Sequence, residues 1–328
     1  STSAQDITFS GNSDLAPDWL WFKARIASNH FLFDKVRGVL KTISSDDATA
    51  EVTSTGSMTA FGTDGFSLGD GGSDNDINGV SGTTYVAWGW AAGNSAGSSN
   101  SDGSITSTVT ANTTAGFSIV KYTGTKSNAT IGHGLGVVPK MIMIKDTTNA
   151  ESWIVYHEGV GNDGNLYLNL TNAKATQAVF QDTTPTSSVF SIGTTDGVNK
   201  ASAVHVAYCF AEVEGYSSFG GYTGNGSTDG AFVYTGFSPA FIMYKVTSTT
   251  DSWEMYDTQR RTINPYGTQL KANLSNAETD DTRIDILSNG FKARSTNTAV
   301  NASGATYIYM AFAENPFGGD GAAPATAR

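Results

Sequence analysis

Large apolar side chains alternate with polar ones in short runs along most of the chain, which is the period-two pattern of half-buried β-strands. The runs end at Gly, Asn, Asp or Pro, which are the residues that favour turns. Lys, Glu, Leu and Gln never build a periodic amphipathic run of useful length, so helices are not expected. The pattern therefore predicts an all-β chain.

The same order of landmarks occurs three times along the chain. Each copy has a strand from Pro to Lys, an aromatic pair, a third strand, a short strand containing Phe, and an Asn turn before a long aromatic strand. The first and last landmarks occupy residues 17–23 and 78–91, then 139–145 and 199–212, then 239–245 and 301–314. The opening Pro and the closing aromatic residue lie 73, 71 and 73 positions apart in the three copies. This constant order and spacing indicates three copies of one module.

Each copy offers several short strands separated by turns, which is typical of a two-layer antiparallel sandwich. We therefore expect three tandem antiparallel β-sandwich modules of jelly-roll type, each with its own aromatic-lined interior. Residues 93–115 are rich in Gly and Ser and are interpreted as a flexible linker with an exposed strand. The expected modules cover residues 1–92 (with a short leading strand), 116–216 and 217–319, and residues 320–328 are expected to form a flexible tail.

Charge and cysteine content narrow the possible functions. Charged residues make up only 15% of the chain, the net charge is −11, and there is no basic cluster, so nucleic acid is not an expected partner. No apolar stretch is long enough for a membrane span, so membrane insertion is not expected either. Cys209 is the only cysteine, which excludes an intrachain disulfide framework and favours a buried thiol in its apolar run.

Residues capable of catalysis do not form a recognisable constellation. The four histidines lack metal-ligand spacing, and the repeat exchanges His157 for Asp34 and Asp257 in the other copies. A glycan depolymerase would need paired carboxylates. Glu254 with Asp257, or Asp280 with Asp281, could be imagined in that role, but their spacing does not support it. We therefore expect a protein that is not an enzyme.

Asp and Arg recur three residues apart at 34 and 37 and again at 257 and 260. Such a pair could clamp a ligand, or it could form a salt bridge or turn hydrogen bond at the end of a strand. Because the second copy replaces the motif with His157-Glu158, we favour the structural interpretation.

One acidic loop is the best candidate for a metal site. Residues 74–79 match the first half of an EF-hand loop, but Tyr85 takes the place of the bidentate Glu that completes it. The loop is either a solvated turn or a Ca²⁺ site of another type, with Asp70, Asp74, Asp76 and Asn78 as candidate ligands. No other cofactor is expected.

Tryptophan is concentrated in the first copy. Trp19, Trp21, Trp88 and Trp90 occupy alternating positions of two strands, so at most one face of each strand is expected to be core. Packing within or between modules is the ordinary role for such residues, and stacking on sugars is the alternative. These four residues are our candidate ligand-binding set.

The residues of these landmarks resemble a repeat family found in tail-fibre-like virion proteins of marine tailed phages. The resemblance covers nearly the whole chain, and it is clearest at residues 17–25, 33–38, 65–69, 85–90 and 131–139. It implies a concanavalin-like or jelly-roll sandwich and a structural or adhesive role on the virion surface, and it supplies no catalytic residues.

We therefore expect a non-enzymatic phage virion surface protein of the fibre, spike or capsid-decoration type. Its expected partners are host surface glycans, neighbouring virion subunits and further copies of itself, with a homotrimer favoured. The alternative is a cellular lectin, secreted or surface-bound, with tandem carbohydrate-binding sandwich modules.

Overall fold

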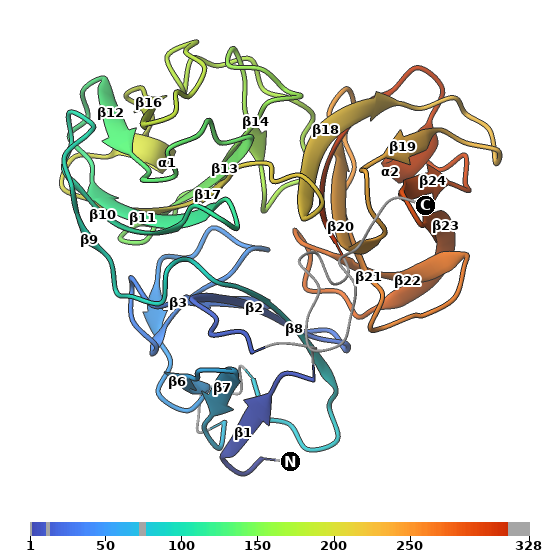
Figure 1. Ribbon diagram of the computed structural model, residues 1–328, viewed down its shortest axis with the longest axis horizontal. Coiled ribbons are helices and arrows are strands. Elements are labelled where there is room, and N and C mark those ends of the chain that lie inside the picture. The colour runs from blue at the N-terminus through green and yellow to red at the C-terminus, as the bar shows by residue number, and fades with distance from the viewer. Residues whose placement is uncertain (1, 11–13, 72–76, 314–328) are drawn as a thin grey trace.

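The computed structural model describes residues 2–10, 14–71 and 77–313. The chain is nearly all β and its sheets are antiparallel, as expected for sandwich modules. Figure 1 shows three lobes arranged around a common centre, one for each copy of the repeat. No helix in the described part of the chain has the length and hydropathy needed to cross a bilayer.

The first lobe pairs a five-stranded sheet, in the order β5-β4-β3-β2-β8, with a three-stranded sheet, β1-β7-β6. Its interior lies between the two sheets and includes Leu20, Phe22, Phe33 and Phe66. The strands are β1 (Gln5–Thr8), β2 (Trp19–Ala24), β3 (His30–Asp34), β4 (Lys41–Ile43), β5 (Val52–Thr53), β6 (Met58–Phe61), β7 (Gly65–Leu68) and β8 (Tyr85–Trp90).

The second lobe pairs a seven-stranded sheet, β15-β14-β13-β17-β11-β10-β9, with the two-stranded sheet β12-β16. Cys209 is fully buried in its interior, as expected from the sequence. The elements are β9 (Ser98–Asn100), β10 (Ser107–Asn112), β11 (Phe117–Thr123), β12 (Ala129–Gly132), β13 (Met141–Asp146), β14 (Ile154–His157), β15 (Leu166–Tyr167), β16 (Val189–Ile192), α1 (Asp196–Asn199) and β17 (Val204–Phe210).

The interpretation of residues 93–115 as a flexible linker with an exposed strand needs correction. The segment contains two strands, β9 and β10, which belong to the second sheet, and no residue of β10 is exposed. Strand β10 pairs along its length with β11, and β9 pairs with β10 at the edge. An edge strand can be polar on its outer side, so a Ser- and Gly-rich composition did not distinguish it from a flexible segment.

The third lobe contains one eight-stranded sheet, β18-β25-β20-β21-β22-β23-β24-β19. The sheet curls so that Val233 and Phe291 of its far end pack in one cluster with Ile242 and Tyr244. The elements are β18 (Ser217–Thr223), β19 (Phe232–Tyr234), β20 (Pro239–Val246), β21 (Trp253–Asp257), β22 (Tyr266–Lys271), β23 (Thr279–Leu287), β24 (Gly290–Ala293), α2 (Thr298–Asn301) and β25 (Thr306–Ala313). The expected tail, residues 320–328, lies outside the described residues.

The two faces of each opening strand enter different cores. In β2, Leu20 and Phe22 face the interior of the first lobe, whereas Trp19 and Trp21 enter a central cluster shared by all three lobes. The same alternation places Met141 and Met143 of β13, and Phe241 and Met243 of β20, in this central cluster. We call this cluster the central core. The expectation that the large aromatic residues line separate interiors is therefore corrected, because the tryptophans of the repeats pack between modules.

Contacts between the lobes follow a ring, from the first to the second, the second to the third, and the third back to the first. The same hydrogen bond occurs at each of the three junctions. Its donor is a ring N–H at one position of the repeat, and its acceptor is a backbone carbonyl at another position of the repeat in the neighbouring lobe. These bonds join Trp153 Nε1 to Ser44 O (2.7 Å), Trp253 Nε1 to Tyr167 O (2.9 Å) and His30 Nε2 to Lys271 O (3.0 Å). The three modules of one chain thus form a closed ring with approximate threefold symmetry, as a cyclic trimer would.

Candidate functional site

The four candidate tryptophans are buried in the central core, with exposed fractions of 0% for Trp19, 1% for Trp21, 7% for Trp88 and 5% for Trp90. Trp19 stacks on Tyr208 of the second lobe, with ring centroids 4.5 Å apart. None of them offers a face on which a sugar could stack. The structure thus corrects the proposed ligand-binding set, because the second face of each strand is covered by a neighbouring lobe and not by solvent.

The two Asp–Arg pairs lie buried at junctions between lobes, and the structural interpretation of these pairs is confirmed. Each aspartate also accepts a hydrogen bond from the closing strand of the neighbouring lobe. The contacts are Arg37 Nε to Asp34 Oδ2 (2.5 Å), Tyr208 Oη to Asp34 Oδ2 (2.7 Å), Arg260 Nε to Asp257 Oδ2 (2.6 Å) and Trp88 Nε1 to Asp257 Oδ2 (3.1 Å). A buried carboxylate is tolerated here because the arginine of its own lobe balances its charge and a side chain of the neighbouring lobe donates a hydrogen bond to it.

The third junction uses different residues for the same purpose. The position of Tyr208 and Trp88 is taken by Met310, whose thioether has no proton to donate. The aspartate is replaced correspondingly by His157, whose Nε2 donates to Tyr309 O (3.1 Å) while Nδ1 accepts from Gly159 N (3.0 Å). Burial lowers the pKa of His157 to about 4, so the imidazole is neutral near pH 7. The exchange of Asp for His is therefore explained by the partner across the junction.

Lys23, Lys145 and Lys245 close the opening strands and are fully buried. Burial lowers the pKa of each lysine to about 8. Every ammonium group bonds the carbonyl of the next residue, and Lys145 and Lys245 also reach Ala48 O (3.1 Å) and Thr171 O (3.3 Å) of the preceding lobe. Lys23 differs in that its second bond goes to Ile26 O (2.9 Å) of its own lobe. Because all three ammonium groups bond backbone carbonyls, the buried lysine has a structural role in each copy.

Asp74 and Asp76 of the proposed metal loop lie outside the described residues, whereas Asp70 and Asn78 at its two ends lie within them. Asn78 is 4% exposed, and its amide donates to Ser3 O (2.8 Å) and Gly69 O (2.7 Å) and accepts from Gln5 Nε2 (3.0 Å). Asp70, at the other end, is exposed. Among described residues, no group of three or more His, Cys, Asp or Glu side chains is placed to hold a metal ion. Asn78 therefore serves as a structural turn residue, as Asn199 and Asn301 do in the other lobes.

The carboxylates considered for a depolymerase do not converge. Glu254 faces the interior of the third lobe beside Tyr244, whereas Asp257 faces a junction between lobes. Asp280 pairs with Arg261 (3.1 Å) and Asp281 with Arg283 (2.5 Å). Each of these carboxylates is therefore engaged separately, and they do not form a facing pair.

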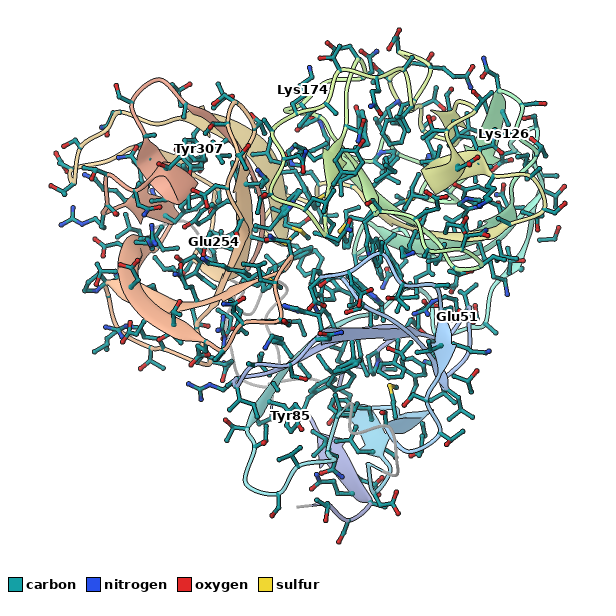
Figure 2. All side chains as sticks on the ribbon, turned by 180° about the vertical axis from the view of Figure 1, so that it is seen from behind. Glu51, Tyr85, Lys126, Lys174, Glu254 and Tyr307 are labelled. Carbon is teal, nitrogen blue, oxygen red and sulfur yellow. The ribbon has the colours of Figure 1, made fainter. Side chains whose placement is uncertain are left out.

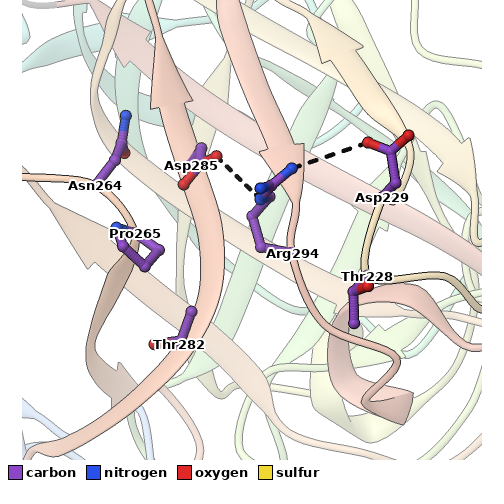
Figure 3. Close-up of a pocket in the computed structure, with 7 residues that line it drawn as sticks. All are labelled: Thr228, Asp229, Asn264, Pro265, Thr282, Asp285 and Arg294. Carbon is purple, nitrogen blue, oxygen red and sulfur yellow. Dashed lines mark ion pairs between the residues drawn. The ribbon is translucent and has the colours of Figure 1, made fainter.

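The outer side of the third lobe carries an open hollow of about 700 Å³. Figure 3 shows Arg294 between two carboxylates, with Nε 3.1 Å from Asp285 Oδ2 and Nη1 3.9 Å from Asp229 Oδ1. The other lining residues are Thr228, Asn264, Pro265 and Thr282. This hollow, which we call the third-lobe hollow, presents polar side chains to solvent, in contrast to the buried polar groups at the junctions.

Our sequence reasoning did not identify the third-lobe hollow. Its residues come from four separate segments, so no local motif joins them. A comparison of the three copies does indicate that this face of the third lobe differs from the others. Lys292 in β24 occupies the position that Ser67 has in β7 and Ser191 has in β16. The third copy has therefore gained charge on a face where the first two copies carry a small hydroxyl residue.

Comparison with known proteins adds the family but no activity. A family model described as a domain of unknown function (DUF7483) matches residues 1–316. No curated protein and no solved structure shows significant similarity to the chain. The match covers all three lobes, so the ring of three modules corresponds to one family domain and not to three separate ones. The chain belongs to the DUF7483 family of domains of unknown function.

Proposed function

We propose that this chain is a non-enzymatic structural protein on the outer surface of a phage particle, of the fibre, spike or capsid-decoration type. In this proposal it adheres to host surface glycans or joins neighbouring virion subunits. The observation that carries the proposal is that the charged and aromatic residues that recur in the repeat are buried at the junctions between lobes. There they connect three modules into one ring around a buried core, as expected for a protein with a structural role.

The ring also supports multivalent attachment. Three modules related by approximate symmetry place three outer faces on one chain, and linked weak sites give useful avidity when their geometry allows simultaneous contact. The homotrimer expected from the sequence would multiply these faces further. An acidic chain with few charged residues also suits an exposed position, since its net charge of −11 keeps it soluble.

Particles purified from a lysate test the proposal directly. We expect mass spectrometry to detect this chain in intact particles, and antibodies against it to label their surface in electron micrographs. Particles that lack the chain, or that expose it only after disruption, would refute the proposal. Detection of the chain on the surface of uninfected cells would favour the alternative of a cellular lectin.

A further inference from the structure

The third lobe presents two large aromatic side chains to solvent. Phe232 and Tyr234 on β19 are 47% and 61% exposed, whereas Val233 between them is 5% exposed and packs inside the lobe. Residues two apart on a strand share one face. The two rings therefore stand side by side on the outer face of an edge strand.

This aromatic pair adjoins the third-lobe hollow. Strand register places Phe232 directly opposite Lys292, and Lys292 directly opposite Asp285, which lines the hollow. Two strand spacings separate Phe232 from Asp285, or roughly 10 Å. Lys292 Nζ also lies 2.5 Å from Asp229 Oδ1 at the rim. The rings, the cations and the carboxylates thus form one continuous surface.

The equivalent faces of the other lobes lack this surface. The positions of Phe232 and Tyr234 are occupied by Thr130 and Gly132 in β12 and by Asp6 and Thr8 in β1. The sandwich folds in all three lobes, so the aromatic pair is not needed for packing. Solvent-exposed aromatic side chains that the fold does not need indicate a binding role.

We infer that Phe232, Tyr234 and the third-lobe hollow form a binding site for a neutral glycan. Aromatic rings can pack against the C–H faces of sugar rings, while Asp and Arg side chains bond sugar hydroxyls on both the donor and the acceptor side. This inference deepens the proposed adhesive function by naming the module, the residues and the ligand class.

Charge decides between neutral and acidic ligands. Asp229 and Asp285 balance Lys292 and Arg294 across the site, so its formal charge is zero and no cation is left over for a sulfate, phosphate or uronate. The net charge of −11 further disfavours a polyanion. The hydroxyl groups of an uncharged sugar polymer can donate hydrogen bonds to the carboxylates and accept them from the cations, and the ion pairs of the site stay intact.

Native gel electrophoresis through dissolved polysaccharide tests the site with the full chain. The neutral probes are mannan, dextran and xyloglucan, and alginate is the acidic probe. We expect at least one neutral polysaccharide to retard the wild-type chain and alginate not to retard it. Phe232→Thr with Tyr234→Thr should weaken that binding by about tenfold or more, the effect expected when central aromatic contacts are lost.

A matched control uses exposed apolar residues of the second lobe. Val137 and Val138 are 49% and 40% exposed, so Val137→Thr with Val138→Thr changes a similar surface away from the site. We expect this variant to bind as the wild type does, and circular dichroism should show both double variants folded. The inference is overturned if no neutral probe retards the chain, if alginate retards it more strongly, or if the aromatic variant binds unchanged.

The two proposals fail separately. A chain found on the particle surface that binds no neutral glycan would overturn the glycan site and leave a structural virion role standing. A chain that binds glycan through Phe232 and Tyr234 but is absent from particles would overturn the virion role alone.

Discussion

Trp19→Ala should destabilise the whole chain by about 3–5 kcal/mol, the usual loss when a buried Trp is truncated. Trp19 is fully buried in the central core, where its ring lies 4.5 Å from Tyr208, 4.6 Å from Trp90 and 5.6 Å from Phe117. Truncation would remove contacts to two lobes at once and leave a cavity between them. Urea unfolding of wild type and variant measures the difference.

Trp19→Phe is the matched control for this prediction. Its ring fills part of the space, and the indole N–H, which has no hydrogen-bond partner in the described part of the chain, is removed. We expect a loss clearly smaller than that of Trp19→Ala. A loss below about 1 kcal/mol for Trp19→Ala would show that the central core contributes little.

Glu254→Ile should stabilise the chain by about 2–3 kcal/mol at pH 8 and by much less at pH 5. Glu254 is 1% exposed and neither of its carboxylate oxygens accepts a hydrogen bond from the described residues. Its position in the third lobe, labelled in Figure 2, corresponds to Ile154 in the second lobe and Phe31 in the first. The fold therefore accepts an apolar side chain at this position.

Burial raises the pKa of Glu254 from 4.5 to about 7, an effect that Lys271 and Arg283 reduce only in part. The folded state thus binds a proton more tightly than the unfolded state does. The cost of ionising Glu254 is absent below about pH 4.5, grows as the pH rises to 7, and is complete above 7. Glu254→Ile removes that cost, so its advantage should grow over the same interval.

The difference in stability between Glu254→Ile and wild type reports the titration of Glu254 alone, because the other titrating groups are the same in both proteins. Burial lowers the pKa values of all four histidines, which makes stability rise with pH below about 6.5 in both proteins. Exposed Glu214→Gln serves as the control and should have no effect at either pH. A gain that is equal at pH 5 and pH 8 would contradict the assignment of a titrating buried carboxylate. Thermal unfolding at the two pH values measures it.

The repeat and its strands could be predicted from the sequence because period-two alternation and turn residues are local signals. The equivalence of Asp34, His157 and Asp257 followed from spacing alone, and strand register confirms it. The part of the molecule that covers the second face of a strand depends on how the lobes pack together, and the residues of the strand itself do not reveal it. Trp19 and Leu20 are both apolar, and only the arrangement of the lobes shows that they enter two different cores.

The signal that both faces are buried was nevertheless present in the sequence. The opening strands of all three copies are apolar at consecutive positions, which is typical of a strand covered on both sides. Phe232 and Tyr234 were overlooked for the opposite reason. Their alternation with Val233 has the form of an ordinary strand, and only their exposed fractions show that the apolar side chains face solvent.

The most direct test of the closed ring uses Cys209 as a reporter of the second lobe. Its thiol is fully buried in that lobe, whereas Leu20 is fully buried in the separate interior of the first lobe. If the three lobes open as one unit, Leu20→Ala should speed the labelling of Cys209 by a thiol reagent roughly a hundredfold, since such truncations cost about 3 kcal/mol. A labelling rate equal to that of the wild-type chain would contradict the ring, because it would mean that the lobes unfold independently.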